Sequence, residues 1–133
     1  MANDTLLFNC SAEHLDGGDQ RLKFFDLAGI LDIAPEDAEL KTVQAVSVTL
    51  AASESNVEVP LPAGMTTGKL LCIKTSDSIT VKRNSTSGEA LPIGKWKSTK
   101  PGGCLIGPTS FTSLYISNSV AREVSVEVLI GGV

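Results

Sequence analysis

Hydrophobic and polar positions alternate most regularly in the last quarter of the chain, residues 111–133. Within it, Leu114 and Ile116 fall on one face of an extended strand. After a polar break, every second residue from 124 to 130 is Val or Ile. A period of two on both sides of a turn is typical of two antiparallel strands with one buried face. We therefore expect these two segments to pair, although the sequence leaves open whether Phe111 and Tyr115 face inward instead.

Shorter alternating segments occur from residue 41 onwards, separated by turns rich in Gly, Pro, Asn and Ser. These segments are 46–50, 57–61, 69–75, 79–81, 91–93 and 104–106. Pro60 and Pro62 lack the amide hydrogen that an inner strand needs, so their strand is expected at a sheet edge or to end there. About eight short strands at this spacing predict an all-β, antiparallel β-sandwich of jelly-roll type. Connections of two to six residues are typical of antiparallel neighbours.

Residues 1–40 differ from the rest of the chain in pattern and in charge. They carry nine acidic residues against two basic ones, a net charge of −7, whereas residues 41–133 carry nine basic against six acidic residues, a net charge of +3. The local elements expected there are a short strand at 6–8, a turn at 16–19, a buried apolar stretch at 21–33 and a one- or two-turn helix from Pro35. We interpret 1–40 as an acidic arm that packs on the β-sandwich domain, 41–133, or on a neighbouring subunit.

The length and composition are those of a single domain with its own core. The chain has 133 residues, of which 42% are hydrophobic and 20% charged. No apolar run approaches the ~20 residues of a membrane-spanning helix, and the N-terminus lacks the layout of a secretory signal. We expect a soluble protein, made in a cytoplasm, that contacts no membrane.

Catalytic and metal-binding patterns are missing from the sequence. His14 is the only histidine, and its pairing with Cys10 lacks a third member and an oxyanion hole. Without a CxxC pair or a second histidine, a zinc site is not expected. Cys10, Cys72 and Cys104 are odd in number and widely spaced, so we expect three reduced thiols, with Cys72 in a strand core. The prediction is a protein without enzymatic activity, metal or cofactor.

The most basic part of the chain is a candidate partner contact. It consists of Lys82, Arg83, Lys95, Trp96, Lys97 and Lys100. Basic residues around a tryptophan suit phosphates or sugars, because the ring stacks on a base or a pyranose face. The net charge of −4 disfavours nucleic acid, while carbohydrate stays open. The alternative is a solvated loop whose Trp96 caps the sandwich or fills a pocket on a neighbour.

Three segments resemble the small β-sandwich structural proteins of tailed-phage virions. They are VEVPLPAG at 57–64, KLLCIKTSDSITVK at 69–82 and LIGPTSFTSLYISNSVAREVSVEVLIGG at 105–132. The shared features are paired strands around a short turn and a Ser/Thr-rich final hairpin that ends in glycines. The resemblance implies a protein that decorates or cements a capsid, or sits in the tail, as symmetric copies. We expect a homo-oligomer, such as a trimer.

The expected function is therefore that of a non-enzymatic virion protein. Its partners would be copies of itself and other virion proteins, and it would be found in the virion after assembly in the host cytoplasm. The long valine faces of the strands leave exposed sheet edges that packing between subunits would cover. The alternative is a carbohydrate-binding receptor module of a phage tail, which requires Trp96 or Tyr115 to face solvent.

Overall fold

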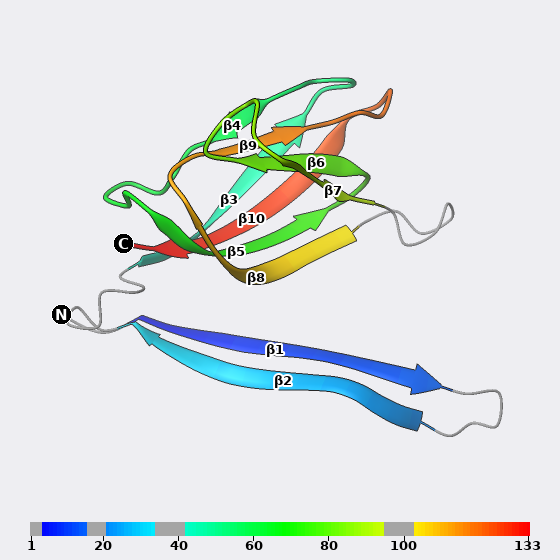
Figure 1. Ribbon diagram of the computed structural model, residues 1–133, viewed down its shortest axis with the longest axis vertical. Coiled ribbons are helices and arrows are strands. Elements are labelled where there is room, and N and C mark those ends of the chain that lie inside the picture. Colours follow the sequence, from blue (N-terminus) through cyan, green and yellow to red (C-terminus); the bar gives the residue numbers. More distant parts are fainter. Residues whose placement is uncertain (1–3, 16–20, 34–41, 95–102) are drawn as a thin grey trace.

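The computed structural model describes residues 4–15, 21–33, 42–94 and 103–133 (Figure 1). These parts of the chain form ten strands and no helix. The strands are β1 (Asp4–Leu15), β2 (Arg21–Ile33), β3 (Thr42–Leu50), β4 (Val57–Val59), β5 (Gly68–Thr75), β6 (Ile79–Arg83), β7 (Ala90–Ile93), β8 (Gly103–Phe111), β9 (Leu114–Ser117) and β10 (Val124–Gly132). The all-β fold predicted from the sequence is confirmed.

Strands β3 to β10 form two antiparallel sheets that pack face to face (Figure 1). We call the sheet with the order β3-β10-β5-β8 the long sheet, and the sheet with the order β4-β9-β6-β7 the short sheet. Most connections cross from one sheet to the other, so neighbours in sequence are seldom neighbours in a sheet. This order is that of a jelly roll, an eight-stranded double sheet. The predicted sandwich and its jelly-roll character are therefore both observed.

One expected strand pairing is wrong. Residues 114–117 form β9 in the short sheet, whereas 124–132 form β10 in the long sheet, so the two strands do not pair. Their inward faces were predicted correctly, because Leu114 and Ile116 are fully buried. Alternation reports which side of a strand is buried and carries no information about the strand beside it. The polar connection at 118–123 leads across the sandwich instead of folding back as a hairpin.

The core fills the space between the two sheets. Its fully buried side chains include Leu50, Val59, Leu71, Ile73, Ile79, Val81, Phe111, Leu114, Ile116, Val124, Val126 and Ile130. The Phe111 ring lies against the backbone of Gly68, where a Cβ atom would come within 2.7 Å of the ring carbon Cε2. A glycine is therefore required beneath this ring.

The strand expected at 57–61 is β4, an edge strand that ends at Val59 before the first proline, as predicted.

Buried polar groups close one end of the sandwich. Asp77 is 3% exposed and accepts hydrogen bonds from the backbone amide of Ser78 at 2.8 Å and from Nε of Arg122 at 2.7 Å. Asn118 is 1% exposed, and its Nδ2 donates to the carbonyl oxygens of Ala51 at 2.8 Å and of Arg122 at 2.7 Å. Buried polar atoms need such partners to offset the loss of water. The two side chains thereby tie three loops together.

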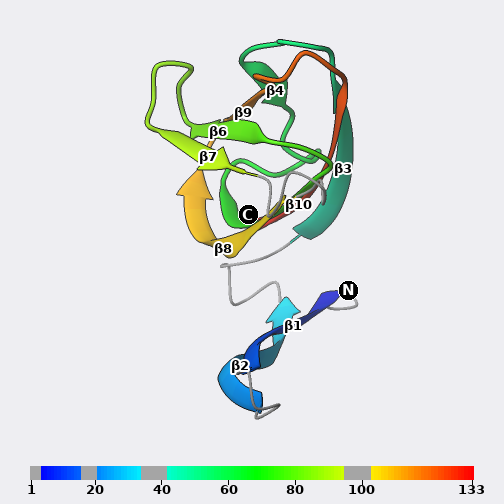
Figure 2. The same ribbon diagram turned by 90° about the vertical axis from the view of Figure 1, so that its right-hand side faces the viewer.

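Strands β1 and β2 form a separate antiparallel hairpin outside the sandwich (Figures 1 and 2). Their register shifts once, between Ala12 and Glu13. Among the described strands, neither is hydrogen-bonded to the long or the short sheet. The strand expected at 6–8 is part of the twelve-residue β1, and 21–33 is a strand throughout. The turn expected at 16–19 and the helix expected from Pro35 lie outside the described residues.

Candidate functional site

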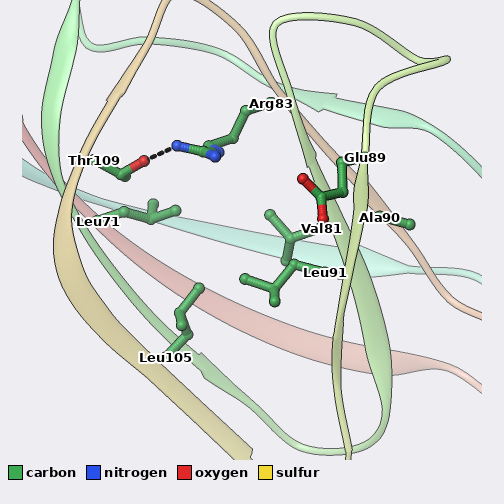
Figure 3. A pocket seen from close by; sticks show the side chains of 8 residues that line it. All are labelled: Leu71, Val81, Arg83, Glu89, Ala90, Leu91, Leu105 and Thr109. Atoms are coloured by element: carbon green, nitrogen blue, oxygen red, sulfur yellow. Dashed lines mark hydrogen bonds between the residues drawn. The ribbon is translucent and has the colours of Figure 1, made fainter.

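A groove opens at the side of the sandwich where the edge strands β7 and β8 of the two sheets face each other (Figure 3). It has a volume of about 360 Å³. We call it the side groove; its walls are Leu71, Val81, Arg83, Glu89, Ala90, Leu91, Leu105 and Thr109. Leu91 follows the inward alternation of β7 yet is 47% exposed, because the two sheets separate at this edge. The groove is the lateral opening of the hydrophobic core.

Arg83 is the cationic group of the side groove. It occupies the last position of β6 and continues the inward alternation of Ile79 and Val81. Its guanidinium donates a hydrogen bond to the Thr109 hydroxyl, so it links β6 of the short sheet to β8 of the long sheet (Figure 3). Glu89 supplies a carboxylate to the same wall. The combination of apolar floor and mixed charges suits an amphipathic segment better than a small polar substrate.

Lys82 and Arg83 are adjacent in sequence but lie on opposite faces of the short sheet. Lys82 is on the outer face, where its Nζ donates to the backbone oxygen of Thr86 at 2.8 Å. A two-residue period separates neighbouring side chains in a strand, so the two cations do not form one patch. The other candidate contact residues, Lys95, Trp96, Lys97 and Lys100, lie outside the described residues.

The outer face of the short sheet carries an aromatic ring between two charges. Tyr115 alternates with the fully buried Leu114 and Ile116, so it faces away from the core. Its cross-strand neighbours are Glu58 on β4 and Lys82 on β6. A half-buried ring flanked by hydrogen-bonding side chains is the kind of flat surface on which a sugar ring can stack.

The free edge of β3 is the feature that sequence reasoning did not single out. β3 pairs with β10 along all nine residues, and among the described strands it has no partner on its other side. From Leu50 back to Gln44, its inward side chains become more exposed. Leu50 is buried, Val48 and Val46 are half-buried, and Gln44 is exposed. The strand across the core, β4, is only three residues long, so the inner face of β3 extends beyond its cover. The sequence signal for this unprotected edge was the absence of any charge or proline in the β3 residues TVQAVSVTL.

Cys72 differs from its expected place. It is half-buried on the outer face of β5, next to Leu129 of β10, and not in the core between the sheets. The core-facing residues of this strand are its neighbours Leu71 and Ile73. Burial raises the pKa of the Cys72 thiol above its ordinary value of 9.0. A thiol with a raised pKa is a poor nucleophile at neutral pH.

Candidate metal ligands do not gather in the described part of the chain. Residues 42–94 and 103–133 contain no cluster of three or more His, Cys, Asp or Glu side chains suited to a metal ion. The side chains of His14, Cys10 and Cys104 lie outside the description. No helix in the described ranges could cross a membrane.

Comparisons with known proteins give no family. No protein-family model matches the chain, and no curated protein matches it in sequence. The solved structures that are similar in shape include two with low sequence identity. One is the cupin domain of Cnp3 from Schizosaccharomyces pombe, with 11% identity and a TM-score of 0.41, covering 96% of this chain and 84% of that chain. The other is from the endospore appendages of Bacillus, described as disulfide-linked pili, with 9% identity and a TM-score of 0.39, covering 69% of this chain and 88% of that chain. At these TM-scores neither structure assigns a function to this chain.

Proposed function

We propose that this protein is a non-enzymatic structural module that assembles with copies of itself on the particle of a tailed phage, where it decorates or cements the capsid. The observation that carries the self-assembly is the free edge of β3, nine residues long and without charge or proline. An exposed edge of this kind is a template for another chain, and soluble monomers normally block it. The unprotected edge of β3 is best explained by a partner chain that covers it.

The placement on a phage particle rests on the sequence resemblance. The resembling segment 57–64 contains β4, 69–82 contains most of β5 and β6, and 105–132 contains β9, β10 and most of β8. They therefore account for most of the sandwich. Jelly rolls occur in viral capsid proteins but also in lectins and cupins, so the fold by itself permits several functions.

The distribution of charge supports contacts between subunits. The hairpin β1–β2 belongs to a segment with a net charge of −7, and the sandwich belongs to one with a net charge of +3. Opposite charges on two parts of one chain attract in solution, either within a subunit or between subunits. Among the described strands, the hairpin forms no sheet hydrogen bonds with the sandwich, which supports a role in contacts with a second copy.

The proposal is tested on two levels. Light scattering of the purified full chain is expected to give a mass of at least twice the 13.9 kDa of one chain. Mass spectrometry of purified phage particles whose genome encodes this sequence is expected to find the chain in many copies per particle. A stable monomer at micromolar concentration would contradict the self-assembly, and absence from the particles would contradict the placement on a virion.

The second candidate is a carbohydrate-binding receptor module, which Tyr115 favours. Its ring lies on the outer face of the short sheet between Glu58 and Lys82. A glycan array probed with the wild type, Tyr115→Phe, Tyr115→Ala and Trp96→Ala separates the two functions. A sugar site needs the ring, so binding would survive Tyr115→Phe and be lost in Tyr115→Ala. The absence of any glycan signal favours the scaffold.

A further inference from the structure

The four edges of the two sheets differ in how well they are protected. β4 has three residues and is followed by Pro60 and Pro62, and β7 has four residues and contains Pro92. β8 contains Gly107 and Pro108. Short length and proline are the usual means by which proteins prevent edge-to-edge pairing. β3 has neither, since its nine residues TVQAVSVTL contain no charge, proline or glycine.

The described neighbours of β3 in the long sheet carry little free charge. On the outer face, one charged residue lies among the β10 partners of β3: Glu127, which lies opposite Ser47 and forms an ion pair with Lys74 at 3.8 Å. A strand placed beside β3 would therefore find no unpaired charge among these partners to attract it. The hairpin strands do not match this edge, because β1 contains Asp4 and Glu13 and β2 contains four charged residues. A neutral strand is the better complement, and β3 of a second copy is one.

The inner face of β3 gives the second reason. Val46 and Val48 face inward but are only half-buried, because the short sheet does not reach across them. When two β3 strands lie antiparallel, the valines of both copies meet along one seam. The outward residues Ala45, Ser47 and Thr49 are small, so two sheets can approach to the normal strand spacing of about 4.8 Å.

From these observations we infer that β3 pairs edge to edge with β3 of a second copy around a two-fold axis. The two long sheets then join into one continuous sheet, and each copy contributes the same residues. This inference rests on the proposed self-assembly and names the surface that performs it. It also defines the elementary unit as a dimer, on which any larger symmetry would be built.

The first experiment places a charge on this edge. Ser47→Lys introduces a lysine opposite Glu127, so the isolated sandwich is expected to keep its fold, as far-UV circular dichroism can verify. In the dimer the two new lysines come close together near the axis and repel. Light scattering is expected to show a fall from at least two chain masses to one, or at least ~10-fold weaker association. The matched control is Ser110→Lys, which adds the same charge to the exposed surface of β8 at the opposite edge of the same sheet and is expected to associate like the wild type.

The second experiment does not depend on how well the charged variant folds. In a chain with Cys72 and Cys104 replaced by serine, single cysteines are introduced at Ala45, Ser47 or Thr49 and oxidised. A residue faces itself only at the two-fold axis, and Ala45 faces Ser47 of the other copy when the axis passes Val46. Either one of these positions alone or an equimolar mixture of the Ala45→Cys and Ser47→Cys chains is therefore expected to form a disulfide dimer efficiently, whereas Ser110→Cys is not. Cys10 of β1 is retained as a reporter. A disulfide from β3 to Cys10 would overturn the inference, because it would place a hairpin strand on the edge.

The outcomes separate the inference from the proposed function. A monomeric wild type contradicts both. An oligomer that is unaffected by Ser47→Lys and yields no β3–β3 disulfide contradicts the edge pairing alone and leaves self-assembly through another surface. Loss of association in both Ser47→Lys and Ser110→Lys also contradicts the edge pairing, because a general effect of charge would explain it.

Discussion

β3 and β10 have similar sequence patterns but different environments. Both alternate valine with polar or small residues, and they pair with each other over nine residues. The inward residues of β10 from Val124 to Ile130 are 0–1% exposed, whereas Val46 and Val48 of β3 are half-buried. Among the strands that the structure describes, β10 has a neighbour on each side, and β3 has one. The comparison shows that alternation identifies the inward face of a strand, whereas the depth of burial depends on neighbours that alternation does not reveal.

The largest expected difference is between aspartate substitutions at the register partners Val126 and Val48. At Val126 the carboxylate would lie in the core without a partner, so we expect a loss of at least ~4 kcal/mol, enough to abolish a cooperative unfolding transition. At Val48 the carboxylate can reach water at the sheet edge, and the expected loss is about 1–2 kcal/mol.

Both variants are made in the Ser47→Lys background, so that association between copies does not contribute to the measured stability. Urea unfolding followed by circular dichroism gives the free energy of unfolding for each. Equal losses at the two positions would show that the edge of β3 is as enclosed as the centre of the sheet.

The next prediction concerns how tightly the end of β10 is enclosed. A Cβ atom at Gly132 would lie 2.8 Å from Sδ of Met65, 3.0 Å from Cα of Gly68, and closer still to the carbonyl oxygen of Thr67. Backbone atoms cannot yield as a flexible side chain does, so Gly132→Ala is expected to cost about 1–3 kcal/mol.

The matched control is Gly94→Ala, directly after β7, where no atom of the described residues lies within 4 Å of the added atom. That change is expected to alter stability by less than about 1 kcal/mol. Thermal unfolding of the two variants beside the wild type measures the contrast. A neutral Gly132→Ala would mean that the 65–68 segment is not fixed against β10.

The smallest expected effect concerns Cys72, which lies beside β10 on the outer face. In a chain with Cys10 and Cys104 replaced by serine, the rate of reaction with a disulfide reagent is followed against pH, folded and in urea. The midpoint is expected at higher pH for the folded chain, because burial raises the thiol pKa above 9.0.

The sign for stability follows from the same shift. The pKa of the Cys72 thiol is higher in the folded chain than in the unfolded chain. The neutral thiol therefore contributes fully to the free energy of unfolding below the unfolded pKa, and this contribution is lost as the pH rises through the folded pKa. Stability is therefore expected to fall slightly above about pH 9. Coincident midpoints would show that Cys72 is as solvated in the fold as in the unfolded chain.

The fold class could be predicted from the sequence because burial between two layers imposes a period of two. Leu114, Ile116 and the valines of β10 were placed on the correct face for this reason, and Pro60 marked the end of an edge strand. The pairing of β9 with β10 was wrong because a short connection was assumed to join neighbours in one sheet. In a jelly roll such connections cross between the sheets, and nothing local distinguishes the two cases.

The candidate sites could be predicted less well. The cluster of basic residues was defined by proximity in sequence, but strand geometry directs Lys82 and Arg83 to opposite faces. The side groove depends on Thr109 and Leu91, which come together only when β7 and β8 meet at the side of the sandwich. The β2 strand at 21–33 has no regular period because, as part of a hairpin outside the sandwich, it is not a layer of the core.

The position of β10 also determines when the long sheet can form during synthesis. Gly132 pairs with Thr42 on one side and with Gly68 on the other. A nascent chain that ends before residue 124 therefore holds β3 and β5 without the strand that separates them. Long-range pairing of this kind is slow, and unpaired valine-rich strands aggregate readily. Until the ribosome has released residues 124–132, β3 and β5 therefore lack their shared neighbour and are exposed to pairing with other chains.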